Sequence, residues 1–155
     1  MQTGHPVLST FHASSMEKLI QRLTGEPILV PKSYIDNLNV VVIQGRILGS
    51  NGEIFRRVLS VNEILGYDSE TDSFNFIEVF SWDPLLKSFR FKGFGCSYIL
   101  ERIAERRGLP RKEIRLLYLE MERRAQILKD MVKRGIFDFF DVFSHLTSFE
   151  ESFPR

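Results

Sequence analysis

The sequence is poor in cysteine and in long apolar runs. Its single cysteine, Cys96, has no partner for an internal disulfide, which fits a reducing compartment. No apolar run approaches the roughly 20 residues of a membrane-spanning helix. Residues 1–6 lack the basic start and the apolar stretch of a signal peptide. We therefore expect a cytoplasmic protein without a transmembrane segment.

The chain also lacks an excess of charge of either sign. Lys and Arg total 21 against 20 Asp and Glu, which gives a net charge of +1 at pH 7. Such a balance provides no general attraction for nucleic acid or an anionic membrane, so a polyanion site has to be local. Basic residues are not clustered with Trp82 or Tyr98, so we expect these rings to pack rather than to stack on bases. Nucleic acid is therefore not a predicted partner.

Sequence patterns for the commonest catalytic sites are missing. His5, His12 and His145 are not spaced as metal ligands, and no second cysteine joins them. No nucleophile elbow indicates a hydrolase triad. Residues 93–95 lack the third glycine of a dinucleotide-binding loop, and no Gly-Lys-Ser/Thr occurs that would form a P-loop. We predict no metal site, no catalytic residue and no complete nucleotide-binding loop in this chain.

What the sequence contains is typical of a folded α/β protein. Of its 155 residues 43% are hydrophobic and 26% charged, enough to bury a core. The apolar, β-branched run 7–10 predicts a buried strand, and the capping-box spacing of Ser14 and Glu17 predicts a helix to about Gly25. A strand followed by a helix is an α/β pattern. Because that strand stands so close to Met1, we expect the chain to begin within a fold.

An antiparallel meander is predicted next. The run 40–43 consists of four consecutive apolar β-branched residues, which predicts a strand covered on both faces. The turn signal 49–52 predicts a hairpin between 40–48 and 54–61. Phenylalanines at alternate positions in 74–80 and 89–91 add two more strands.

The last third of the sequence reads as helical. Ser97 can cap a helix to about Arg107, and Pro110 suits the first turn of a long helix that ends near Arg134. We interpret the apolar stripe of this long helix as core. Asp138 can cap a final helix. We therefore predict an α/β region with a meander over residues 1–92 and a helical subdomain over 93–155.

Thr10 and His12 lie where the predicted first strand ends and the first helix is about to begin. This carboxyl edge is where α/β proteins bind ligands, and phosphates in particular. A threonine hydroxyl and an imidazole N–H are both donors, so their hydrogen bonds could report the presence or loss of a phosphate. The alternative is a histidine that only ties down a loop.

A longer string, residues 2–13, combines Thr-Gly-His, a short strand and Thr-x-His-Ala, and it resembles the His box of the type II/type IV secretion ATPase superfamily. The resemblance continues over most of the chain, and its later blocks are most similar to the archaeal branch. They include Arg56-Arg57-Val58, Glu63-Ile64, Gly66-Tyr67-Asp68, Phe80-Ser81-Trp82-Asp83-Pro84 and the segment from Ser97 to Gly108.

The resemblance implies a RecA-like P-loop ATPase of type IV pilus, archaellum or type II secretion assembly, acting as a hexameric ring. Residues 1–92 would be the C-terminal remainder of its α/β core, and 93–155 a helical bundle. His12, with Thr10 and His5 nearby, would sense nucleotide near the γ-phosphate or between subunits. Arg56 and Arg57 would contribute charge at a subunit boundary, although adjacent strand residues point to opposite faces, so at most one can address a given site.

In relatives of this kind the Walker A loop, the acidic box and the Walker B segment precede the His box. The resemblance therefore implies that ATP and Mg²⁺ are bound mainly by regions absent from this chain, which alone would be inactive. Its implied partners are the upstream ATPase region, the other subunits of a homohexamer and a membrane platform protein, at the cytoplasmic face of the membrane. The alternative is a non-catalytic interaction module, or stand-alone paralogue, that docks on such a platform.

Overall fold

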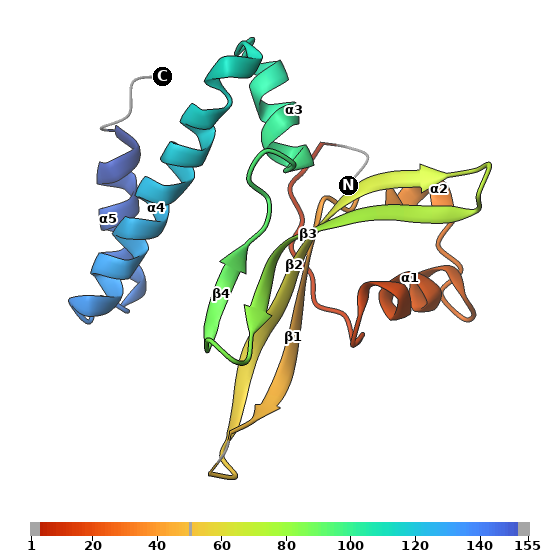
Figure 1. The fold of residues 1–155 in the computed structure, drawn as a ribbon, viewed down its shortest axis with the longest axis horizontal. Coiled ribbons are helices and arrows are strands. Elements are labelled where there is room, and N and C mark those ends of the chain that lie inside the picture. The colour runs from red at the N-terminus through yellow and green to blue at the C-terminus, as the bar shows by residue number, and fades with distance from the viewer. Residues whose placement is uncertain (1–3, 50, 152–155) are drawn as a thin grey trace. The chain divides into compact units, whose positions relative to one another are not determined.

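A computed structural model of the protein describes residues 4–49 and 51–151 (Figure 1). It is a mixed α/β protein with a four-stranded antiparallel sheet. The chain divides into two compact units, Met1–Arg106 and Arg107–Arg155, each described by itself below. Helix α3 (Tyr98–Arg106) belongs to the first unit. None of the helices in the described ranges is both long and apolar enough to cross a membrane.

The sheet follows the chain in the order β1-β2-β3-β4. Its strands are β1 (Val40–Leu48), β2 (Ile54–Asp68), β3 (Ser73–Asp83) and β4 (Ser88–Phe91). Every neighbouring pair is antiparallel, so the predicted hairpin and meander are confirmed. The hairpin turn is closed by the Gly49 N–H, which donates to the Glu53 carbonyl at 2.7 Å. Ser50, part of the predicted turn signal, lies outside the described residues.

Strand β2 is long because it serves two partners in succession. Figure 1 shows the β1–β2 and β2–β3 hairpins extending in opposite directions from the middle of the sheet. The β1–β2 register shifts between Ile43 and Gln44, where Leu59 is the extra residue of β2. Such bulges bend a strand and increase its twist. Gly45 accommodates the bulge, since a Cβ at this position would lie 2.5 Å from a Leu59 methyl carbon.

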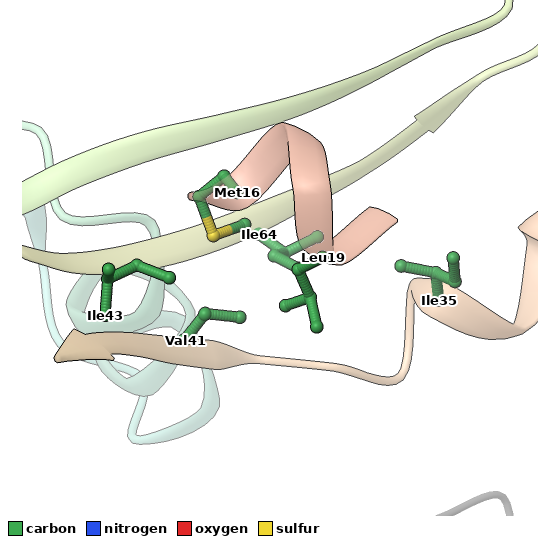
Figure 2. Close-up of a cluster of buried hydrophobic side chains, with 6 residues drawn as sticks. All are labelled: Met16, Leu19, Ile35, Val41, Ile43 and Ile64. Carbon is green, nitrogen blue, oxygen red and sulfur yellow. The ribbon is translucent and has the colours of Figure 1, made fainter. Parts of the chain in front are cut away.

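One face of the sheet carries the main core of the first unit. Helices α1 (Met16–Thr24) and α2 (Lys32–Ile35) pack there. The cluster, drawn in Figure 2, is apolar throughout and consists of Met16, Leu19, Ile35, Val41, Ile43 and Ile64. Each of these side chains is less than a tenth exposed, so burial here provides the main drive for folding of this unit.

The prediction that β1 is covered on both faces is wrong. Val41 and Ile43 are buried, but Val40 and Val42 are 44% and 48% exposed. Side chains alternate between the two faces of a strand, and the two helices cover only one face of β1. The other face of β1 is therefore open.

The N-cap of α1 is Ser15, not Ser14 as the spacing predicted. Ser15 has extended backbone angles, φ −154° and ψ 172°, and its hydroxyl accepts a hydrogen bond from the Lys18 N–H at 3.3 Å. The same hydroxyl donates to Glu17 and so holds the pKa of that carboxyl below its ordinary value. The predicted end of the helix at Gly25 is confirmed. The N-cap lies one residue later than predicted because the N-cap is the last residue with non-helical backbone angles before the helix. In this chain that residue is Ser15.

The predicted opening strand is also wrong for the chain as described. Residues 5–13 form no regular secondary structure, and Val7, Leu8 and Phe11 are exposed. A strand requires a neighbour to pair with, and none of the ladders β1–β2, β2–β3 and β3–β4 includes this segment. The apolar, β-branched sequence is present, but none of the described strands pairs with it.

The second unit holds a 3₁₀ turn (Arg111–Glu113) and the helices α4 (Arg115–Lys133) and α5 (Phe139–Glu151). Asp138 caps α5 as predicted, accepting the Phe140 N–H at 2.9 Å. The apolar stripe of α4 is core only in part. Leu117 is buried, whereas Leu128 and Val132 are more than half exposed.

Candidate functional site

Thr10 and His12 lie on the exposed segment that precedes α1. Both side chains face solvent, and no hydrogen bond within the described ranges engages the Thr10 hydroxyl or the His12 ring. Arg22 of α1 anchors the backbone of this segment. Its guanidinium donates a hydrogen bond to the His12 carbonyl, and its guanidinium carbon lies 5.3 Å from the centre of the Phe11 ring. Two donor side chains are therefore presented outward on a segment anchored at one end.

His5, the third predicted sensing residue, is exposed on the same segment, and its neighbour Gly4 adopts φ +79°. Thr3, which precedes them in the Thr-Gly-His motif, lies outside the described residues, as does Gln2. The structure thus places His5, Thr10 and His12 on one exposed stretch without regular secondary structure.

This segment does not by itself fit a magnesium–nucleotide complex. Residues 5–13 contain no Asp, Glu, Lys or Arg, so they offer neither a carboxylate for Mg²⁺ nor a lysine or arginine for phosphate. The nearby guanidinium of Arg22 is already engaged by a carbonyl and a ring. Thr10 and His12 supply one hydroxyl and one imidazole for hydrogen bonding, so no catalytic step is assigned to them.

Arg56 and Arg57 lie on β2 in different surroundings. Arg56 stands directly opposite Arg46 of β1 in the strand register. Arg57 stands opposite Gly45, and its guanidinium carbon lies 5.2 Å from the Trp82 ring centre and 5.7 Å from that of Phe55. Such cation–π contacts hold an arginine against the protein. Arg56 therefore remains the more available of the two predicted interface residues.

The structure does not join the two predicted groups. Within the described ranges, Thr10 and His12 share no hydrogen bond, ion pair or ring contact with Arg56 or Arg57. Nor do three or more His, Cys, Asp or Glu side chains of this part of the chain gather as they would around a metal ion.

Sequence reasoning missed a buried polar pair in the first unit. Glu63 of β2 is 6% exposed, and one of its carboxylate oxygens accepts the Ser97 hydroxyl at 2.8 Å. The other oxygen accepts the backbone N–H of Ile99, in the first turn of α3, at 3.1 Å. Glu63, on a strand distant in sequence, thus accepts a hydrogen bond from an N-terminal N–H of α3, a group that has no acceptor within its own helix. The available signal was a polar pair, Asn62 and Glu63, flanked by the apolar residues Val61 and Ile64.

A second missed cluster joins α2 to the β2–β3 turn. Asp72 forms an ion pair with Lys32 of α2 and accepts the Tyr67 hydroxyl at 2.6 Å. These hydrogen bonds, that from Lys32 first and that from Tyr67 second, lower the pKa of the Asp72 carboxyl. The same contact with Asp72 raises the pKa of Tyr67. All three groups are accessible to solvent, and together they fix the turn to α2.

Comparison with known proteins gives relatives but no family description. No family model matches the chain. It is 45% identical over 152 residues to the uncharacterized protein MJ0900 of Methanocaldococcus jannaschii, a match over 97% of this chain and 27% of that protein. It is 40% identical over 131 residues to the uncharacterized protein MJ1287 of the same organism, over 84% of this chain and 46% of the relative. The chain thus spans about a quarter and somewhat under half of these relatives.

Proposed function

We propose that this chain is the C-terminal segment of a ring-forming ATPase of the type II secretion, type IV pilus and archaellum assembly class. It contributes Thr10 and His12 as a nucleotide sensor, with His5 nearby, and it supplies contacts between subunits. The Walker A and Walker B regions that bind ATP and Mg²⁺ are contributed from outside these residues. The RecA-like assignment of the first unit is part of the same proposal and rests on the sequence resemblance to the His box.

The observation that carries the proposal is the exposed run of residues 7–12 before α1, which joins none of the strand ladders in the described part of the chain. Val7 and Leu8 are apolar and exposed, and a run of this kind in a globular protein is normally buried in a sheet. If a preceding α/β region supplied a neighbouring strand, this segment would pair with it and bring Thr10 and His12 to the sheet edge. The two donors are unengaged within the described residues and so are free to meet a phosphate there.

The relatives are consistent with a chain that works as part of something larger. The match to the uncharacterized protein MJ0900 covers nearly all of this chain but only 27% of that protein, which leaves ample sequence for a nucleotide-binding region. In this proposal the homohexamer acts at the cytoplasmic face of the membrane, against a platform protein. The balanced net charge of +1 suits contact with a protein rather than with nucleic acid.

The test is a chimera in which this chain replaces the matching region of the uncharacterized protein MJ0900. We expect the relative and the chimera to hydrolyse ATP, and the isolated chain to show no MgATP binding by calorimetry. His12→Ala in the chimera should lower kcat by about 10²- to 10³-fold, the range found when one preorganised donor to a developing negative charge is removed. His145→Ala, a histidine of α5 whose ring contacts the Asp141 carbonyl, is the matched control and should have little effect.

Two results would overturn this proposal. One is an active chimera whose turnover is unchanged by His12→Ala. The other is an intact relative that neither binds nor hydrolyses nucleotide.

The second candidate is a non-catalytic module that docks on a membrane secretion platform. The exposed phenylalanines of the second unit favour it, because apolar rings in such number on a surface indicate a protein contact. If a platform protein binds the chain tightly while the chimera has no ATPase activity, this candidate replaces the motor.

A further inference from the structure

One arginine and three aromatic rings of the first unit meet on strands β2, β3 and β4. The Arg57 guanidinium carbon lies 5.7 Å from the centre of the Phe55 ring and 5.2 Å from that of the Trp82 ring. Trp82 and Phe89 are register partners, and their rings meet edge-on with centroids 5.1 Å apart. We call Phe55, Arg57, Trp82 and Phe89 the aromatic site.

The guanidinium of Arg57 is held in place, yet its hydrogen-bond donors are not engaged. Stacking on a ring uses the flat face of a guanidinium, whereas its N–H donors lie in its plane. Within the described residues Arg57 forms no ion pair. Asp83, the acidic residue next to Trp82, pairs with Arg90 instead and accepts two backbone N–H groups of the β3–β4 turn. Arg57 is therefore an oriented cation without an anion.

The indole N–H of Trp82 is a second donor without an acceptor. Its Nε1 atom is buried, and no acceptor for it lies in the part of the chain that the structure describes. A buried donor without a hydrogen bond costs free energy, and each such group in a folded protein calls for an explanation. Because Arg57 packs against the same ring, an acceptor that draws the guanidinium aside would also be placed to accept this N–H.

The surroundings of the aromatic site are apolar and exposed. Phe55 and Phe89 are 40% and 49% exposed. The turn that joins β3 to β4 carries Leu85 and Leu86, which are 92% and 64% exposed. Apolar side chains gathered on a surface in this way indicate a contact with another molecule. The site thus combines donors for an anion with apolar area around them.

We propose that the aromatic site binds an extended segment of another protein that is both acidic and apolar. A carboxylate of this segment would take the in-plane donors of Arg57, and its apolar side chains would cover the exposed rings and the two leucines. Arginine and tryptophan are also the residues that most often dominate the binding energy of protein interfaces. Nucleic acid fits less well, because the Trp82 ring already packs against Arg57 and Phe89 and is not free to stack on a base.

This inference goes beyond the proposed function. Only the identification of the bound segment with a platform protein would rest on that function, whereas the binding itself does not. Binding by a chain whose chimera is inactive would leave the contact standing. An active chimera without such binding would leave the ATPase proposal standing.

The test uses a reporter that the site itself contains, because Trp82 is the chain's single tryptophan. The probe is a blocked peptide built from the repeat Leu-Ser-Glu-Ser, whose leucines and glutamates share one face when it is extended. We expect it to change the Trp82 emission with a Kd of about 100 µM or tighter, and to bind less well in high salt. The same peptide with glutamine in place of glutamate should bind at least about tenfold more weakly. Isothermal titration calorimetry detects any binding that leaves the emission unchanged.

Two variants remove the cation or only its shape. R57Q should weaken binding of the glutamate peptide by about tenfold or more, and R57K, which keeps the charge but not the planar fork, should lie between R57Q and the wild type. R102Q is the matched control. Arg102 is an exposed arginine of α3 whose guanidinium carbon lies 5.6 Å from the Tyr98 ring centre, so it makes the same kind of contact away from the aromatic site. R102Q should bind the peptide as the wild type does, and circular dichroism should show that all three variants keep the fold.

Several results would overturn the inference. It fails if the glutamate peptide does not bind at concentrations up to about 1 mM, or binds no more tightly than the glutamine peptide. It also fails if R57Q and R102Q have the same effect. If a single-stranded oligonucleotide or anionic vesicles bind at Arg57 more tightly than the peptide, the partner is not a protein segment. Self-association in sedimentation velocity that R57Q abolishes would make a second copy the occupant instead.

Discussion

At Glu63 a carboxylate stands in the interior of a strand and accepts two hydrogen bonds from the start of α3. The Ser97 hydroxyl lies 2.8 Å from one oxygen, and the Ile99 N–H lies 3.1 Å from the other. Ser97 is 1% exposed, and its hydroxyl oxygen also accepts the Leu100 N–H at 3.2 Å. Glu63 therefore satisfies one buried donor and one helix-terminal donor that have no other acceptor among the described residues.

We expect Glu63→Ala to lower the free energy of unfolding by about 2–4 kcal/mol, because it leaves the Ser97 and Ile99 donors buried without an acceptor. Glu63→Gln retains one acceptor oxygen and should lose less. Urea unfolding followed by circular dichroism measures both changes. Glu78→Ala is the matched control, since Glu78 forms an exposed ion pair with Lys92 at 2.6 Å and should cost under about 1 kcal/mol. Equal losses in the free energy of unfolding for Glu63→Ala and Glu78→Ala would show that burial of the Glu63 carboxylate makes no difference to stability.

The candidate residues were predictable only where their setting is local. Thr10 and His12 share one short segment, so the sequence alone puts them together, as it does the neighbours Arg56 and Arg57. The pairing of Arg46 with Arg56 follows from the predicted hairpin once its register is known. The pairing of Glu63 with Ser97 depends on the docking of α3, and no local pattern in the sequence indicates that contact.

Among the elements, the β2–β3 turn is held to α2 by Asp72. This residue adopts φ +50°, forms an ion pair with Lys32 and accepts the Tyr67 hydroxyl at 2.6 Å. The pKa of its carboxyl is lowered from the ordinary 3.8, first by the hydrogen bond from Lys32 and then by that from Tyr67. The folded state therefore favours the ionised form. The resulting stability is present above the unfolded pKa and is lost as the pH falls through the folded pKa.

Asp72→Asn tests this contribution, because asparagine tolerates positive φ and keeps an acceptor oxygen but carries no charge. We expect the variant to be less stable than the wild type near neutral pH. The difference in free energy of unfolding should shrink as the pH falls below about 4, where the wild-type carboxyl also becomes neutral. Chemical unfolding from pH 7 down to about pH 3 measures it. Asp130→Asn, in the exposed pair with Lys133 at 3.8 Å, is the control; a constant difference at Asp72 across the range would contradict the ionic explanation.

The sequence predicted those helices, strands and turns that are determined by residues close together in the chain. The hairpin turn at 49–52, the alternation in β3 and the glycine at the end of α1 are local features, and the elements they predict are present. The buried opening strand and the two-sided burial of β1 required knowledge of which elements lie alongside. An apolar β-branched run indicates strand propensity, but it does not indicate which other element packs against it and buries it.

At the scale of the whole molecule, the division of the chain depends on α3. Because the last third of the sequence reads as helical, the sequence predicted a boundary after residue 92, with every later helix in one subdomain. The structure groups α3 with the sheet in a compact unit that ends at Arg106. Glu63 explains why, since its two hydrogen bonds join β2 to the first turn of α3, and Ala104 of the same helix is 1% exposed.

Two truncations distinguish these boundaries. A fragment of residues 1–106 retains α3, and we expect it to unfold cooperatively in urea. A fragment of residues 1–92 lacks Ser97 and Ile99, which leaves the Glu63 carboxylate without its two hydrogen-bond donors. We expect it to be less stable by at least about 2 kcal/mol, from the lost hydrogen bonds together with lost burial. Adding Glu63→Ala should then weaken only the longer fragment. If the two fragments have the same stability, or respond alike to Glu63→Ala, α3 is not part of the first unit and the boundary belongs at residue 92.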